Sequence, residues 1–247
     1  MELIKTIYLR AGKVLAKKPV VLWGVSLLEG VLSTVFGILF GIIPGVSLCI
    51  GLLLSTSMTM IFLNGYRGKE VKAADLFICF KDWATVKRVL CGLGWMYLWV
   101  FLWALIPFVG WIFAIIRIYR YRLTPYILVY EPDVAITDAI KVSAERTKGF
   151  KGKMFGAEVL VYVAYGVVML VLGILALIPY LGILFSLVSW IVGIVFALFS
   201  GLYIGLIQAA FYEEITAASV KRLCPKCEKE VAKTAEFCSH CGANLSE

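Results

Sequence analysis

Four cysteines close to the C-terminus are the residues whose type and spacing best fit a defined chemistry. They form two Cys-x-x-Cys pairs, Cys224 with Cys227 and Cys238 with Cys241, and ten residues separate the pairs. Each pair can fold as a tight turn that directs two sulfur atoms to one point, and two such turns complete a tetrahedron around Zn²⁺. The sequence therefore predicts one zinc ion per chain, bound by these four cysteines.

A redox pair of the thioredoxin type and disulfides are the alternatives to zinc. A single Cys-x-x-Cys would leave them open, whereas two pairs in a cytoplasmic tail favour the metal. Residues 223–247 are also too few to bury a sufficient core, so a metal must supply folding energy. His240 lies inside the second pair, and we do not expect it to be a ligand. Four thiolates leave no open position, which indicates a structural site.

No catalytic motif accompanies the cysteines. His240 is the single histidine of the sequence, which excludes Ser-His-Asp and Cys-His catalysis in the remainder of the chain. The H-E-x-x-H, G-x-S-x-G and phosphate-loop patterns are absent too. We therefore expect a protein that is not an enzyme. Carboxylate chemistry at Asp75, Asp138 or Glu145 stays open, although a solvated loop face explains these residues as well.

The composition indicates a membrane protein. Hydrophobic residues make up 62% of the 247-residue chain, charged residues 16%, and the mean hydropathy is +0.93. A soluble domain has about 45–50% apolar and about 25% charged residues. A spanning helix needs about 20 apolar residues. Six runs approach this length: Val20–Ile42, Val46–Leu63, Val89–Ile106, Val109–Tyr130, Ala157–Leu177 and Leu184–Ala210.

The basic residues indicate how these runs are oriented. The chain has 24 Lys and Arg residues, and three of them, Arg117, Arg120 and Arg122, lie in the fourth run. All the others lie in the N-terminal segment, the 64–88 loop, the 131–156 loop or the C-terminal tail. The positive-inside rule places these four segments, and thus both termini, in the cytoplasm of a multi-pass plasma-membrane protein. The net charge of +8 then reflects contact with anionic lipid headgroups, and we expect no nucleic-acid partner.

The resulting architecture is an all-α membrane protein with about six transmembrane helices in three hairpins. Uncharged turns at Pro44, Pro107 and Pro179 form the hairpin tips. Short amphipathic cytoplasmic helices are expected to open at Val71 and at Val134. We divide the chain into an interfacial amphipathic helix (1–19), a six-helix transmembrane domain (20–213), a helical linker (214–222) and a zinc ribbon (223–247). The interfacial helix has its apolar residues on one face, a pattern typical of lying on a membrane.

Charged residues inside the predicted spans are the second candidate site. Glu29 lies in the first run, and Arg117, Arg120 and Arg122 lie in the fourth. Charges at this depth are costly unless they are paired or hydrated, so these four residues are candidates for a polar intramembrane site. Counting along the runs places Glu29 and Arg117 near the midplane, and we expect them to pair. The alternative is a buried ion pair with a purely structural role. The other arginine side chains would then extend to the cytoplasmic interface.

The segment from Ile106 to Glu214 resembles the bacterial membrane proteins of domain-of-unknown-function family 975. The resemblance rests on Ile-Pro-Phe-Val-Gly-Trp at 106–111, Arg-Tyr-Arg-Leu-Thr-Pro-Tyr-Ile-Leu at 120–128, Asp138-Ala-Ile, and Ala-Ala-Phe-Tyr at 209–212. It implies a multi-spanning membrane domain without an assigned activity. A more distant similarity, to the membrane domain attached to some glycerophosphodiester phosphodiesterases, implies no such activity because the phosphodiesterase domain is absent. The zinc ribbon is an addition to this pattern.

Two functions fit these observations. The first is a membrane component without catalytic activity whose zinc ribbon serves interaction with a cytoplasmic protein or regulation. The second is a transporter or lipid-handling protein that uses the polar intramembrane site. A polar cavity would favour the second, and a packed bundle without a cavity would favour the first.

Overall fold

The computed structural model describes residues 2–17, 19–40, 44–107, 110–178, 180–219, 221–227, 230–232 and 241–244. These residues form a helical body followed by a two-stranded sheet. The elements are α1 (Glu2–Lys17), α2 (Pro19–Leu39), α3 (Pro44–Tyr66), the 3₁₀-helix η1 (Ala73–Phe80), α4 (Trp83–Ala104), α5 (Gly110–Arg120), α6 (Thr124–Tyr130), α7 (Asp138–Arg146), α8 (Lys151–Leu175), α9 (Gly182–Ser219), β1 (Lys221–Leu223) and β2 (Glu230–Ala232).

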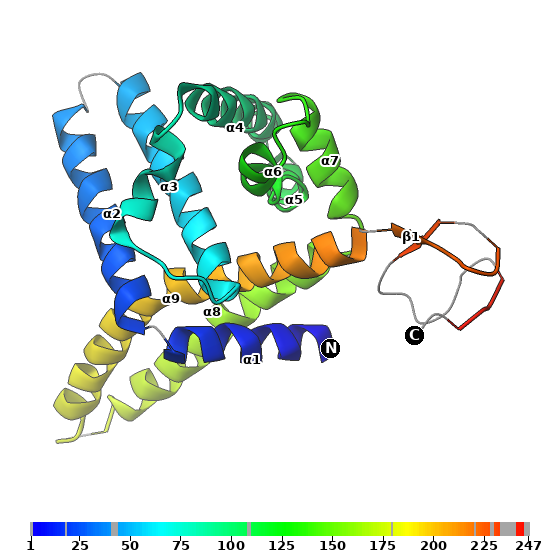
Figure 1. Ribbon diagram of the computed structural model, residues 1–247. Coiled ribbons are helices and arrows are strands. Elements are labelled where there is room, and N and C mark those ends of the chain that lie inside the picture. The colour runs from blue at the N-terminus through cyan, green and yellow to red at the C-terminus, as the bar shows by residue number, and fades with distance from the viewer. Residues whose placement is uncertain are drawn as a thin grey trace.

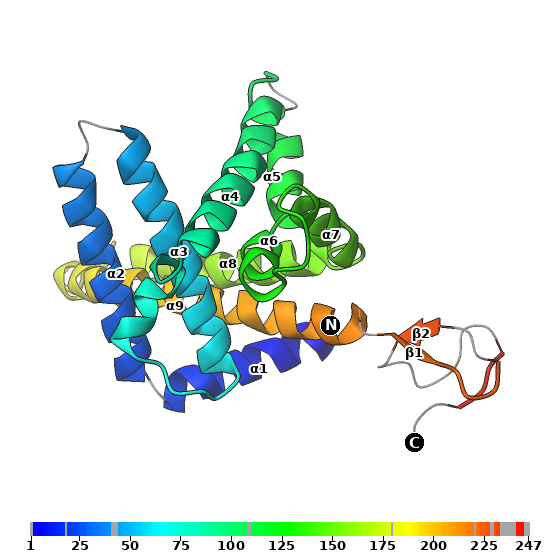
Figure 2. The same ribbon diagram turned by 45° about the horizontal axis from the view of Figure 1, so that its top comes forward.

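Three helical pairs extend from a common base. The pairs are α2 with α3, α4 with α5, and α8 with α9, and each pair packs side by side. Figures 1 and 2 show that the tips of the three pairs point in different directions, whereas their other ends meet. The C-terminal part of α9 passes through this base, where it contacts α1, α3 and α7.

The burial of apolar residues follows this arrangement. In α8, Met154 and Ala157 are buried near the start, but Leu177 beyond its end is 82% exposed. In α9 the order is reversed, because Ile183 at the start is 78% exposed and Leu206 is fully buried. The core therefore lies at the base, where the helix ends opposite the tips adjoin the charged loops. The tip halves present apolar side chains outward, as expected for helices whose solvent is lipid.

Five helices in the described part of the chain are long and apolar enough to cross a membrane: Val20–Leu39, Gly45–Tyr66, Trp83–Ala104, Lys151–Leu175 and Gly182–Ala217. The fourth predicted span, Val109–Tyr130, is not a single helix. It is divided into α5 and α6 by a turn at residues 121–123. Pro125 favours this break, because proline has no backbone N–H and fits best in the first turn of a new helix.

Ser143 of α7 stabilises the break between α5 and α6. Its hydroxyl donates a hydrogen bond to the Arg120 carbonyl at the end of α5 (3.1 Å) and accepts one from the backbone N–H of Leu123 (3.2 Å). At the other end of α6, Arg88 donates from Nε to the Leu128 carbonyl (2.8 Å) and from Nη2 to the Glu131 carbonyl (2.7 Å). In a continuous helix these backbone groups would form hydrogen bonds with one another. At the ends of α6 they form hydrogen bonds with side chains instead.

The N-terminal helix has the apolar face that the sequence predicts, and this face packs against protein. Ile7 and Ala11 are fully buried, and Tyr8 and Val14 pack against the same core. Tyr8 donates a hydrogen bond to the Ala157 carbonyl of α8 (2.5 Å). An amphipathic pattern identifies the buried face of a helix but does not distinguish a lipid surface from a protein surface.

Short helices also begin in the two segments where amphipathic helices are predicted. After Val71, the 3₁₀-helix η1 begins at Ala73, and the Asp75 carboxylate accepts a hydrogen bond from the Lys72 backbone N–H (2.9 Å). After Val134, α7 begins at Asp138. Both helices bury apolar residues in the core of the base, so they are part of the helical body.

Candidate functional site

The predicted metal centre begins with a short β-hairpin. Strands β1 and β2 pair antiparallel, with Leu223 opposite Glu230, so the chain reverses direction between them and carries Cys224 and Cys227 in the connection. Gly242, directly after Cys241, has a positive φ of 71°, which glycine adopts without strain. Tight turns therefore follow or contain Cys224, Cys227 and Cys241.

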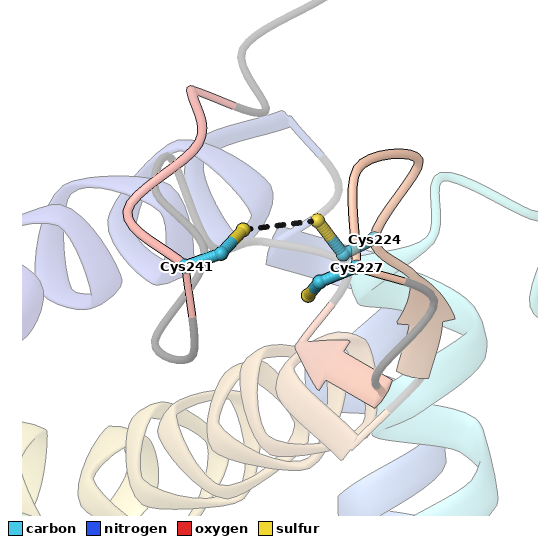
Figure 3. Close-up of side chains that lie close together, drawn as sticks. All are labelled: Cys224, Cys227 and Cys241. Atoms are coloured by element: carbon cyan, nitrogen blue, oxygen red, sulfur yellow. Dashed lines mark hydrogen bonds between the residues drawn. The ribbon is translucent and has the colours of Figure 1, made fainter.

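Three sulfur atoms converge in this region. The ligand atoms of Cys224, Cys227 and Cys241 all lie within 4.8 Å of one another, and the Cys224 and Cys241 Sγ atoms are 3.7 Å apart. Figure 3 shows Cys241 approaching the other two from the opposite side. Tetrahedral zinc with Zn–S distances of about 2.3 Å has sulfur–sulfur edges of about 3.8 Å. A disulfide requires about 2.05 Å, so the spacing fits metal ligands and excludes a Cys224–Cys241 disulfide.

Cys238, the fourth predicted ligand, lies outside the described residues, as does His240. The burial of the cysteines is uneven: Cys224 is buried, Cys227 is half-buried and Cys241 is exposed. Cys224 forms a small apolar cluster with Cys227 and Ala243, separate from the core of the helical body. The three described thiols suit Zn²⁺, which four thiolates would hold in a closed, structural site.

The structure separates the predicted intramembrane charges. Glu29 accepts a hydrogen bond from the Ser33 hydroxyl (2.9 Å), one turn further along α2. Arg117 places its guanidinium 5.0 Å from the centre of the Trp103 ring and donates to the Tyr121 hydroxyl (3.3 Å). Among the described residues, no ion pair joins Glu29 to Arg117. The buried Nε of Arg120 has no hydrogen-bond partner in this part of the chain.

Arg122 is the predicted charge that has an ionic partner, Glu158 of α8. The two side chains are 3.1 Å apart, with exposures of 30% and 11%. The same carboxylate accepts hydrogen bonds from the Tyr119 hydroxyl (2.6 Å) and from the amide of Gln208 in α9 (2.9 Å). Glu158 therefore links α5, the following turn, α8 and α9. These contacts hold the helices at fixed positions relative to one another.

Sequence reasoning missed Glu158 because this residue lies at the edge of a predicted span. The fifth run begins at Ala157, so Glu158 is far from the midplane, where the sequence predicts the pairing of Glu29 with Arg117. The available signal was that Arg122 also lies near the loop end of its run. Two opposite charges at the same depth can pair even when both are far from the midplane.

A cavity of about 420 Å³, lined mostly by apolar residues, lies between α2, α3, α6 and α9. Glu29 and Gln208 line it, together with the hydroxyl-bearing residues Ser26, Ser55 and Thr59. Tyr126, which stacks on Tyr212 with ring centres 4.3 Å apart, lines it as well. Glu29 thus belongs to a cavity, and Gln208 connects that cavity to Glu158.

Comparison with known proteins identifies the C-terminal part alone. Residues 223–245 match a zinc-ribbon domain. No curated protein and no solved structure matches the chain. The resemblance of the helical body to domain-of-unknown-function family 975 receives no support from these comparisons.

Fold and site together define the class of protein. It has a helical body with helices capable of crossing a membrane, which indicates a membrane protein, and a C-terminal zinc-ribbon domain.

Proposed function

We propose that this chain is an integral plasma-membrane protein without catalytic activity whose cytoplasmic zinc ribbon serves protein interaction or regulation. The convergence of the Cys224, Cys227 and Cys241 sulfur atoms carries the proposal. A metal held by four thiolates has no open position for a substrate, so the ion stabilises a small fold. Such a fold offers a surface for a partner.

The location of the ribbon supports this role. It follows α9, which runs through the core of the helical body and ends at Ser219, two residues before β1. A partner that binds the ribbon would therefore be held at the base of the helical body. The positive-inside bias of the loops supports a cytoplasmic location for that base.

The test compares proteins recovered with the full chain and with a Cys224→Ser/Cys227→Ser variant, by crosslinking in cells and quantitative mass spectrometry. We expect a specific cytoplasmic protein to be lost from the variant, because the ribbon cannot fold without its metal. Cys91→Ser, which changes a cysteine outside the ribbon, is the control. Recovery of the same proteins with the ribbon variant would contradict the proposal.

The cavity that Glu29 and Gln208 line favours a second candidate function, that of a transporter or lipid-handling protein. It contains Glu29, one of the predicted intramembrane charges, and it lies between helices that could cross the bilayer. Reconstitution of the full chain and measurement of lipid transfer between vesicles tests this function. Transfer rates equal to those of protein-free vesicles would exclude lipid transfer.

A further inference from the structure

A cluster of basic side chains lies where the end of α5 meets the start of α8. Arg117 and Arg120 occupy the last turn of α5, and Lys151 is the first residue of α8, three residues after Lys148. Arg120, Arg117 and Lys148 are all close enough to the Lys151 ammonium group to repel it electrostatically. Four like charges are thus gathered at the base of the helical body.

Hydrogen bonds hold these two segments together in spite of the repulsion. The Arg120 carbonyl at the end of α5 accepts a hydrogen bond from the Thr147 hydroxyl (3.0 Å), in addition to the one from Ser143. Thr147 is fully buried and directly precedes Lys148 in the chain. The packing of buried groups therefore sets the spacing of the cations.

No carboxylate of the described residues neutralises this cluster. The ion pairs that the structure describes join other residues, including the neighbouring Arg122 with Glu158. Arg117 donates to the neutral Tyr121 hydroxyl, and the Arg120 side chain donates no hydrogen bond within the described part of the chain. Cations that are held together without a counter-charge create a positive potential, and this potential attracts an anion.

The first turn of α8 adds to this positive potential. Phe150, the residue that precedes the helix, forms no side-chain capping hydrogen bond, and the first turn contains no acidic residue. The partial positive charge of the helix N-terminus therefore acts on the same space as the cations. This space is open, because a Cβ atom at Gly149 or at Gly152 would meet nothing within 4 Å.

Exposed apolar side chains adjoin the cluster on the side of the helical tips. On α5, Ile116 lies one turn before Arg120 and is 45% exposed. On α8, Phe155 lies one turn beyond Lys151 and is 46% exposed. Because α5 runs toward the base and α8 runs away from it, both apolar residues lie between the cations and the tips. Cations at the base with apolar surface beyond them fit a lipid, which has an anionic headgroup and acyl chains.

We propose that this cluster binds an anionic phospholipid of the cytoplasmic leaflet whose headgroup carries two phosphate groups, as that of diphosphatidylglycerol does. The phosphates accept hydrogen bonds from Arg120 and Lys151, and the acyl chains lie along Ile116 and Phe155. A single phosphate would leave most of the four positive charges uncompensated, and basic pockets between membrane helices bind headgroups of this kind. None of the four cations lines the Glu29 cavity, so the inference rests on the proposed membrane location alone.

The experiment titrates the delipidated full chain in detergent with diphosphatidylglycerol and with phosphatidylglycerol of the same acyl chains, and native mass spectrometry measures the bound fraction. We expect diphosphatidylglycerol to bind roughly tenfold more tightly, the size expected of an additional charge-assisted contact. Arg120→Gln/Lys151→Gln should abolish this preference. Lys5→Gln/Lys13→Gln, which removes two exposed charges of α1 outside the cluster, should retain it.

Thermal unfolding of the lipid-free protein separates loss of binding from loss of folding. Arg120→Gln/Lys151→Gln removes two charges that repel each other, so this variant should melt no lower than the parent chain. Lys148 is exposed, and Lys148→Gln should weaken diphosphatidylglycerol binding without changing the core. Lys151→Arg keeps the charge and should retain the lipid preference. Unchanged affinity in Lys148→Gln, or an unchanged preference in the double variant, would overturn the proposal.

Soluble pyrophosphate distinguishes the source of the two phosphates. We expect it to compete only weakly, because it has no acyl chains to contact Ile116 and Phe155. Competition at the concentration at which the lipid binds would overturn the assignment to a lipid, and equal binding of both lipids to the parent chain would reject the headgroup with two phosphates. Alkaline extraction of cell membranes tests the membrane location separately. A chain that resists extraction but shows no lipid preference would reject this site and leave the proposed function in place.

Discussion

Arg122 Nη2 of the α5–α6 connection lies 3.1 Å from Glu158 Oε1 of α8, and this ion pair joins segments 36 residues apart in sequence. The carboxylate also accepts hydrogen bonds from Tyr119 and Gln208. Glu158 is therefore a junction between three helices.

Removal of one partner of this pair should destabilise the protein more than removal of both. Glu158→Gln leaves the Arg122 guanidinium without its counter-charge, and we expect each single variant to lose about 1–3 kcal/mol, less than for a fully buried pair because Arg122 is 30% exposed. The Arg122→Gln/Glu158→Gln double variant should lose less than either single variant. Thermal unfolding in detergent measures these losses.

The exposed Arg10–Glu214 pair provides the matched control. Its side chains are 57% and 32% exposed, so Arg10→Gln should cost less than about 1 kcal/mol. Additive losses at Arg122 and Glu158 would show that the two residues contribute independently.

Gly205 of α9 should not tolerate a larger residue, whereas Gly201 should. A Cβ atom at Gly205 would come within 2.4 Å of the Phe62 ring of α3, but one at Gly201 would meet nothing within 4 Å. Both Gly→Ala changes gain about 1 kcal/mol of helix propensity. Gly205→Ala should in addition lose about 1–3 kcal/mol through overpacking. Equal thermal stability of the two variants would show that α3 and α9 are not in close contact.

Purified protein should contain one zinc ion per chain. The Cys224→Ser/Cys227→Ser variant should contain none, because two remaining thiolates cannot complete a tetrahedral site. Cys91→Ser should retain the metal. Elemental analysis by mass spectrometry makes the measurement, and full zinc occupancy in the double variant would refute the assignment of the ligands.

The hairpin tips should face the outside of the cell and the charged loops the cytoplasm. In a chain whose Cys49, Cys79 and Cys91 are replaced by alanine, Tyr180→Cys should react with a membrane-impermeant maleimide in intact cells, since Tyr180 is fully exposed. Lys148→Cys should react only after the cells are made permeable. Labelling of Lys148→Cys from outside would reverse the topology.

The Cys79 thiol of η1 should react slowly. Burial raises its pKa above the ordinary value, so a smaller fraction is thiolate, the reactive form, at any pH below that raised pKa. In a Cys49→Ala/Cys91→Ala background, maleimide labelling of Cys79 should therefore be slow at pH 8, rise with increasing pH, and become rapid on unfolding.

The additional change Lys81→Cys in that background is the control for this measurement, because Lys81 is exposed two residues after Cys79. It should introduce a rapidly labelled site. Equal labelling rates at the two positions in the folded protein would show that η1 does not pack on the core.

Much of the architecture is local and therefore readable from the sequence. The apolar runs at residues 20–42, 46–63 and 184–210 correspond to α2, α3 and α9, because a helix of apolar residues satisfies its own backbone. The two cysteine pairs likewise predict the metal ligands, since the geometry of each pair depends on a turn of a few residues.

The tertiary structure alone decided the remaining features, because they depend on which helix faces which. The same apolar run at 109–130 could continue as one helix, but Ser143, 20 residues beyond Leu123, stabilises the break between α5 and α6. The apolar face of α1 could lie on lipid, yet Ile7 is buried against protein. Glu29 and Arg122 are both charges within predicted spans, and only helix packing assigns one to a cavity and the other to Glu158.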